Sequence, residues 1–185
     1  MKVFYRVRVE KKERIPLKGP VIVAANHFSY MDPVVLQSMF PRRIFFMMTE
    51  VYYEGRWKWL FTLLRCICVK QEGSNIASLK AGIRILNKNG VLGIFPEGGV
   101  SKEGILQEGN PGIGFLVTQS GAPVLPVFLS GTHKALPKGA KIPKISRLTV
   151  TYGDPITFKF PDKKTNKEVI TEITRRIMEQ IKALT

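Results

Sequence analysis

The stretch VIVAANHFSYMDP, residues 21–33, decides how this chain folds. It opens with the apolar run VIVAA, which is typical of a strand that is buried on both faces. A polar loop follows. Asp32 and Pro33 then predict the start of a helix, with Asp32 as its N-cap and Pro33 as its first residue. We therefore expect a buried strand, a loop that carries polar side chains, and a helix that runs to about Phe40.

The rest of the chain alternates between strand and helix patterns in the same way. Short apolar or alternating runs predict strands within 3–9, 44–48, 66–69, 91–95, 123–131 and 148–152, and helical spacing predicts helices over 74–87, 112–119 and 166–184. Such alternation predicts an α/β fold, with a mostly parallel or mixed central sheet flanked by helices. We expect residues 1–185 to form one domain.

The composition limits the classes of protein to consider. The chain has 185 residues, of which 44% are hydrophobic, enough for a substantial core. No stretch approaches the ~18 apolar residues of a membrane span, and the first residues lack the apolar block of a signal peptide. We expect a cytoplasmic protein that associates peripherally with the inner face of the cell membrane. We interpret Cys66 and Cys68 as reduced, buried thiols, without a role in metal binding.

The net charge is the strongest signal in the composition. The chain has 29 Lys and Arg against 14 Asp and Glu, a net charge of +15. Such a surface attracts nucleic acid, a phosphorylated ligand, an acidic carrier protein or anionic lipid, or it is a solvated surface with no dedicated partner. The sequence has no RNP-like aromatic motif, no zinc-finger spacing and no long basic tail, so we do not expect nucleic acid.

The aromatic and basic segment YYEGRWKWLFTLLRCICV, residues 52–69, has two interpretations. It is either a helix packed on the core and followed by a strand, or an interfacial segment, because Trp and Tyr beside basic groups favour the boundary between membrane and water.

His27 and Asp32 form the first candidate catalytic pair. Residues five positions apart on a helix point about 140° apart, so the chain between them has to turn for the side chains to meet. The Asp32 carboxylate would then orient one ring nitrogen of His27 and leave the other to accept a proton. The chain has no G-x-S-x-G motif, so we expect a substrate hydroxyl as the nucleophile, with His27 as its general base. The alternative is a structural histidine in a turn.

The second candidate stretch is FPEGGVS, residues 95–101. Glu97 stands between a proline and two glycines, directly after an apolar strand. Glycines there let backbone N–H groups approach a ligand closely, although the same pattern also fits an ordinary turn. Both polar stretches begin where a strand ends, so we expect them on one edge of the sheet.

Together these stretches resemble the glycerolipid acyltransferase family, and within it the lysophosphatidate acyltransferases. NHFSYMD matches the family pattern N-H-x4-D, FPEG with Ser101 matches most of F-P-E-G-T-R-S, and APVLPV at 122–127 matches a later block. The resemblance covers about residues 7–156.

The resemblance implies a glycerol-3-phosphate acyltransferase-like fold. It also implies transfer of a fatty acyl group from acyl-CoA or an acidic acyl-carrier protein to a lysophospholipid, foremost 1-acyl-sn-glycerol-3-phosphate, at an anionic membrane surface. In the resemblance, His27 is the general base, Asp32 orients it, and no metal or prosthetic group takes part. The oligomeric state stays open. The positions that correspond to substrate-binding residues are Asn26, Ser29, Lys70, Glu97, Gly98, Gly99 and Ser101.

The chain also departs from the family pattern, mainly where the family has cations. Gly99 and Val100 replace its Thr-Arg pair, Thr49 stands in place of a lysine, and Lys70 is the cation nearest to another missing arginine. These cations hold the acceptor phosphate in the family, so the departures imply either another lysolipid headgroup or other phosphate-binding cations. The candidates for that role are Lys70, Lys102 and Lys134.

Two other functions fit parts of the sequence. A basic membrane- or nucleic-acid-binding module would use the net charge without catalysis, and a thioesterase would use water in place of the acceptor. We interpret His133, the second histidine, as a surface loop residue that could instead meet an anionic group together with Lys134 and Lys138.

Overall fold

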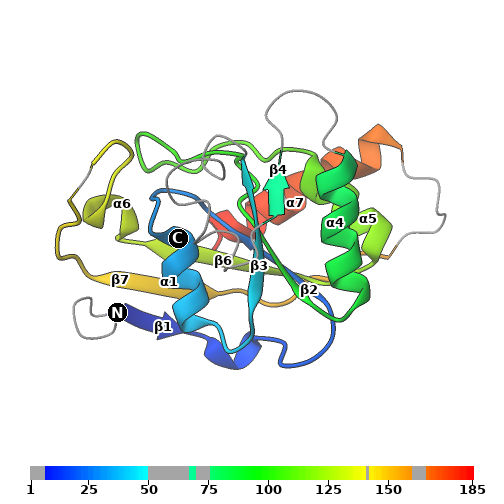
Figure 1. The fold of residues 1–185 in the computed structure, drawn as a ribbon, viewed down its shortest axis with the longest axis horizontal. Coiled ribbons are helices and arrows are strands. Elements are labelled where there is room, and N and C mark those ends of the chain that lie inside the picture. Colours follow the sequence, from blue (N-terminus) through cyan, green and yellow to red (C-terminus); the bar gives the residue numbers. More distant parts are fainter. Residues whose placement is uncertain (1–6, 50–66, 70–75, 141, 160–165) are drawn as a thin grey trace.

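The fold is a mixed α/β sheet covered by helices on both faces (Figure 1). The computed structural model describes residues 7–49, 67–69, 76–140, 142–159 and 166–185. Within these ranges the sheet has seven strands in the order β1-β7-β6-β2-β5-β3-β4. The strands are β1 (Val7–Glu10), β2 (Val21–Ala25), β3 (Ile44–Thr49), β4 (Ile67–Val69), β5 (Val91–Ile94), β6 (Val124–Ser130) and β7 (Leu148–Tyr152).

Neighbouring strands are parallel except for β6 and β7, which run antiparallel. The expected mostly parallel or mixed sheet is therefore confirmed. The helices are α1 (Asp32–Met39), α4 (Ile76–Asn87), α5 (Gly112–Ser120), α6 (Thr132–Ala135) and α7 (Lys167–Lys182), with a 3-10 turn at Lys12–Arg14. No helix in the described part of the chain is both long and apolar enough to cross a membrane.

Strand β2 lies in the middle of the molecule and is buried along its whole length. Val21, Val23 and Ala25 belong to one core cluster, which includes Leu36 of α1. The alternate residues of β2 belong to a second cluster, which includes Ile177 of α7. Helix α1 thus covers one face of the sheet, and α4, α5 and α7 cover the other (Figure 1). Burial on both faces explains why this strand is uniformly apolar.

Most of the predicted elements are present, with small shifts at their ends. The prediction that Asp32 is the N-cap of α1 was wrong, because Met31 holds that position and Asp32 is the first helical residue. The Asp32 carboxylate turns back to the preceding loop, so it does not cap the N–H groups of the helix. Ile76 begins α4 but is 57% exposed, so it does not continue the core face of that helix. The predictions for 3–6 and 52–66 lie outside the described residues.

Candidate active site

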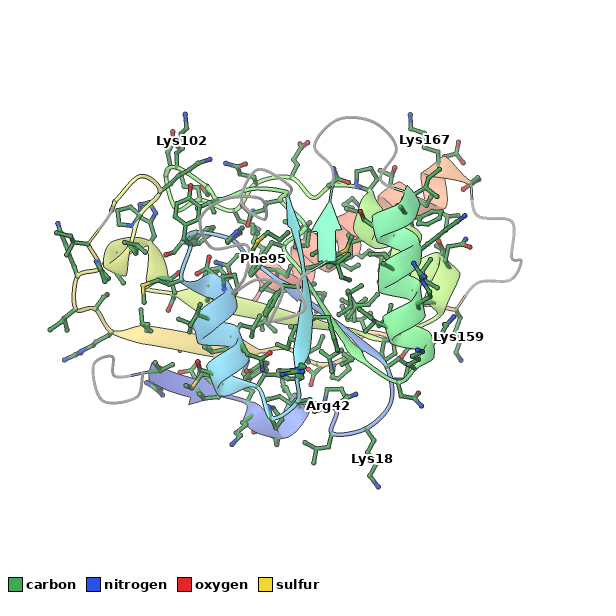
Figure 2. All side chains as sticks on the ribbon, viewed as in Figure 1. Lys18, Arg42, Phe95, Lys102, Lys159 and Lys167 are labelled. Atoms are coloured by element: carbon green, nitrogen blue, oxygen red, sulfur yellow. The ribbon has the colours of Figure 1, made fainter. Side chains whose placement is uncertain are left out.

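The site lies at the edge of the sheet where β2, β5 and β6 end. These strands are parallel neighbours, with β2 between the other two, so the loops that follow them leave the sheet side by side. The two polar stretches therefore share one edge, as expected. Figure 2 shows Lys102, from the loop after β5, on the opposite side of the molecule from Lys18 and Arg42, which lie near the other edge.

His27 and Asp32 meet through the predicted turn. Nδ1 of His27 lies 2.9 Å from Oδ2 of Asp32. Because a carboxylate accepts hydrogen bonds, this contact favours the tautomer with the hydrogen on Nδ1, which leaves Nε2 to accept a proton from a substrate. The His27 side chain is 15% exposed and Asp32 is completely buried. The histidine is thus within reach of a substrate, while its partner is shielded from water.

The loop backbone fixes the Asp32 carboxylate in place. Its Oδ2 also accepts hydrogen bonds from the backbone N–H groups of Phe28 and Ser29, each at 2.7 Å. Its Oδ1 is buried and has no hydrogen-bond partner in the described part of the structure. A buried carboxylate oxygen without a partner favours positive charge nearby.

Two phenylalanine rings form a stack on the face of the imidazole. The ring of His27 stacks on that of Phe95, with centroids 4.0 Å apart and planes inclined by 18°. Phe95 in turn stacks on Phe46 of β3, with centroids 5.9 Å apart. Phe95 also begins the FPEGG stretch, so this stacking joins the two candidate stretches through their side chains.

Glu97 joins the two loops through the backbone. Its Oε1 accepts the N–H of His27 at 2.7 Å, and its Oε2 accepts the N–H of Gln107 at 3.1 Å. Burial raises the pKa of Glu97, and these two backbone N–H groups partly oppose the rise. We expected Glu97 to bind substrate. In the structure both of its oxygens accept backbone N–H groups, one of them from the residue that begins the His27–Asp32 loop. Substrate binding by Glu97 stays a prediction.

Three other expected substrate-binding residues are also used inside the protein. Asn26 is fully buried, and its side-chain amide exchanges two hydrogen bonds with the backbone of Leu129 in β6. Ser29 is buried and donates to the carbonyl of Leu136. Ser101 is buried, and its N–H donates to the carbonyl of His27 at 2.8 Å. These bonds hold the loops together. Substrate binding by the three residues stays a prediction.

An open hollow lies beside the FPEGG stretch. Its volume is about 390 Å³, and it is lined by Gly99, Val100, Lys102, Glu103, Gln107 and Lys138. Gly98 and Gly99 are both exposed, and Gly98 adopts a positive φ of 73°, which favours glycine. Lys138 donates to the carbonyl of Val100 at 3.2 Å. An ammonium group has three donors, so Lys138 retains capacity for a ligand.

The sequence did not predict the part that α6 plays at this edge. His133 is partly buried and lies against Gly104, where an added Cβ would be 2.8 Å from the ring, so it is no free loop residue. Lys138, which follows α6, lines the hollow. Lysines near a predicted strand end were the available signal, but their position relative to the FPEGG loop depends on the pairing of β6 with β2.

Lys70, Cys66 and the aromatic segment lie outside the described residues, apart from β4. Among the residues that the structure does describe, no three His, Cys, Asp or Glu side chains gather in a way that could hold a metal ion.

Comparison with known proteins identifies the family. The family model described as Acyltransferase matches residues 6–130. This chain belongs to the acyltransferase family. The match includes the loops that carry His27, Asp32 and Glu97, although Lys138 lies beyond it.

Named members of the family provide a closer comparison. A chloroplastic 1-acyl-sn-glycerol-3-phosphate acyltransferase of Arabidopsis thaliana is 28% identical over 75% of this chain, which spans 40% of that relative. A 1-acyl-sn-glycerol-3-phosphate acyltransferase of Bacillus subtilis is 24% identical over 96% of this chain and 87% of its own length. The chain thus spans about two fifths of the length of the chloroplastic relatives it matches.

A solved structure shares the fold. The 1-acyl-sn-glycerophosphate acyltransferase PlsC of Thermotoga maritima superposes with a TM-score of 0.75 at 26% identity, covering 97% of this chain and 73% of PlsC. This likeness confirms the expected acyltransferase-type α/β fold.

Proposed function

We propose that this acyltransferase moves a fatty acyl group from an acyl-CoA or acyl-carrier-protein thioester to the free hydroxyl of 1-acyl-sn-glycerol-3-phosphate, which yields phosphatidic acid. The observation that carries the proposal is the contact between His27 and the buried Asp32 at the edge of the sheet. Relatives named for this reaction, from a plant and a bacterium, support the choice of acceptor.

The chemistry follows from the protonation states at the site. Nε2 of His27 takes the proton of the acceptor hydroxyl while the hydroxyl oxygen attacks the carbonyl carbon of the thioester. Asp32 stabilises the imidazolium that forms. The tetrahedral intermediate then collapses, the carbon–sulfur bond breaks, and the imidazolium returns the proton to the departing sulfur. The acceptor supplies the nucleophile, so no serine of the protein is acylated.

The hollow next to Gly98 and Gly99 is the proposed site for the acceptor phosphate. Lys102 and Lys138 line it and supply positive charge. They would replace the arginine that the related pattern carries at the position of Val100. Glu103 also lines the hollow, so it lowers the local positive charge and disfavours a second anionic group. The loop that forms the hollow is bonded to the backbone of His27 through Ser101.

The test is acyl transfer from acyl-CoA and from acyl-carrier protein to a panel of lysolipids, in the wild type and in His27→Ala. We expect the wild type to prefer 1-acyl-sn-glycerol-3-phosphate, and the variant to lose about 10²- to 10⁴-fold in kcat. Lys18→Ala is the control, because Lys18 is exposed on the opposite side of the molecule from Lys102 (Figure 2). Circular dichroism and thermal unfolding confirm that both variants are folded.

Each contrary result excludes a specific part of the proposal. A wild-type rate in His27→Ala would exclude the histidine as the base. Fatty acid released at the same rate with and without a lysolipid would indicate a thioesterase. Preference for a lysolipid without the phosphate monoester would show that the hollow holds another headgroup.

A further inference from the structure

The connection between α6 and β7 presents unusual side chains to solvent. Residues 136–140 and 142–147 are called the docking segment below. In it Ile142 is 80% exposed and Ile145 is 86% exposed, which makes them the two most exposed large hydrophobic residues in the described structure. A solvent-facing isoleucine loses favourable burial, and two of them three positions apart mark a surface that another phase or molecule covers.

The charge around these isoleucines has one sign. Lys134, Lys138, Lys144 and Arg147 are all exposed, and the sequence has no Asp or Glu between positions 131 and 147. Lysines near an anionic lipid surface each add to its attraction, and bulky apolar side chains beside them enter the boundary between headgroups and acyl chains. The segment thus combines the two contributions that hold a peripheral protein on a membrane.

The docking segment is attached to the catalytic edge. The carbonyl of Leu136 accepts the hydroxyl of Ser29, in the loop between His27 and Asp32. Lys138 reaches the carbonyl of Val100 beside the hollow, and the N–H of Lys144 donates to the carbonyl of Ala135 in α6. A third exposed isoleucine, Ile105, is 62% exposed and follows Gly104, which packs against α6. Contact made here would bring the hollow to the contacted surface.

We propose that the docking segment binds the protein to an anionic lipid surface, with Ile142 and Ile145 inserted among the lipids and the surrounding cations on the headgroups. A fluid lipid surface accepts two separately protruding side chains, whereas a folded partner needs a groove that matches them. The inference extends the proposed function, because a lysophospholipid acceptor with a long acyl chain resides in such a surface. Vesicle binding is nevertheless measured without any acyl transfer.

The experiment is co-sedimentation with vesicles of phosphatidylcholine alone and of phosphatidylcholine mixed with phosphatidylglycerol. We expect the wild type to bind the mixed vesicles more tightly, and the double variant Ile142→Asn/Ile145→Asn to bind them at least about tenfold more weakly. The matched control is Leu17→Asn, which removes a 71% exposed leucine at the opposite edge of the sheet, ahead of β2. A second pair of variants tests the contribution of charge to vesicle binding. Lys144→Glu is the test within the docking segment, and Lys18→Glu is its control at the opposite edge of the sheet.

The outcomes separate this inference from the proposed function. Equal vesicle binding by the double variant and Leu17→Asn would overturn the docking segment as the contact. The inference would also be overturned if the double variant kept vesicle binding but lost binding to acyl-carrier protein. The docking segment would then be a protein-binding surface. With monomeric short-chain acceptor, the double variant is expected to keep the wild-type rate, and with acceptor in vesicles to lose it. Loss in both assays would also overturn the inference.

Discussion

At the scale of single residues, the site depends on one carboxylate oxygen that accepts three hydrogen bonds. Oδ2 of Asp32 accepts from Nδ1 of His27 and from two backbone N–H groups. Only one of these contacts involves the imidazole ring. The other two keep the carboxylate in position even if the ring changes, so the loop and the chemistry can be tested separately.

Asp32→Asn is expected to reduce kcat by about 10²- to 10⁴-fold with little change in KM. The amide oxygen can take the place of Oδ2 and still accept the two backbone N–H groups and the hydrogen on Nδ1. The neutral amide carries no negative charge, so it no longer stabilises the imidazolium that forms when His27 takes the proton. Steady-state kinetics measure the loss. Asp154→Asn is the control, since that side chain is 75% exposed. Unchanged turnover in Asp32→Asn would limit Asp32 to a structural role.

Glu97→Gln tests the second carboxylate through the pH dependence of stability. Burial raises the pKa of Glu97 in the folded protein above its ordinary value. The folded state therefore binds the proton more tightly than the unfolded state, and the free energy of unfolding falls as the pH rises from about 4.5 through the raised pKa. The variant lacks this titration.

We therefore expect Glu97→Gln to be less stable than the wild type at low pH, because its amide cannot accept both backbone N–H groups. The stability difference should narrow as the pH rises through this window. Urea unfolding at a series of pH values measures it. A difference that stays constant across the window would show that Glu97 does not titrate as described.

At the scale of elements, the site needs three loops held at fixed distances, and the packing of the helices keeps the sheet beneath them rigid. Helices α5 and α7 approach closely at Gly114. A Cβ on this glycine would lie 2.3 Å from the backbone oxygen of Ile170 and 2.8 Å from Oγ1 of Thr174. Neither helix can yield locally, because the nearest atom belongs to the backbone.

Gly114→Ala is therefore expected to lower the free energy of unfolding by about 1–3 kcal/mol, even though alanine is the better helix former. Gly112→Ala in the same helix is the control. Its nearest neighbour is the side-chain oxygen of Asn110, at 3.2 Å, and we expect a change below about 1 kcal/mol. Thermal and urea unfolding measure both variants. Equal stability would show that the two helices can separate without cost.

At the scale of the whole molecule, the chain carries a net charge of +15, and its basic side chains lie on several parts of the surface (Figure 2). Lys102 lies in the loop after β5, and Lys18 and Lys167 lie at other places on the molecule (Figure 2). The general positive field attracts any anion, and salt screens it. Among the described cations, Lys102 and Lys138 line the hollow that we propose as the site of the acceptor phosphate.

With monomeric acceptor, the double variant Lys102→Ala/Lys138→Ala is expected to raise KM by about tenfold and leave kcat nearly unchanged. Added NaCl should raise KM in the wild type, and less steeply in the double variant. Lys167→Ala is the control, because Lys167 is exposed at the start of α7, away from the hollow. Parallel salt dependence in all three proteins would mean that the hollow does not bind the phosphate.

The sequence by itself determined the local features of this protein. The apolar run at 21–25 predicts a buried strand, because its residue types leave no face for water. The spacing of His27 and Asp32 predicts their contact, because a short loop can close over five positions. The final helix, with Ile173, Ile177 and Ile181 on its buried face, was also predictable from its spacing.

Only the tertiary structure decided which distant residues meet. Glu97 binds the backbone of His27 across 70 positions, and Asn26 joins Leu129 across 103. These contacts exist because β2 lies between β5 and β6. Short apolar strands resemble one another, so their order in the sheet depends on side-chain packing over the whole core. The physical reason for the difference is range: turns and strand burial follow from neighbouring residues, whereas the partners of Glu97, Asn26 and Lys138 follow from strand order.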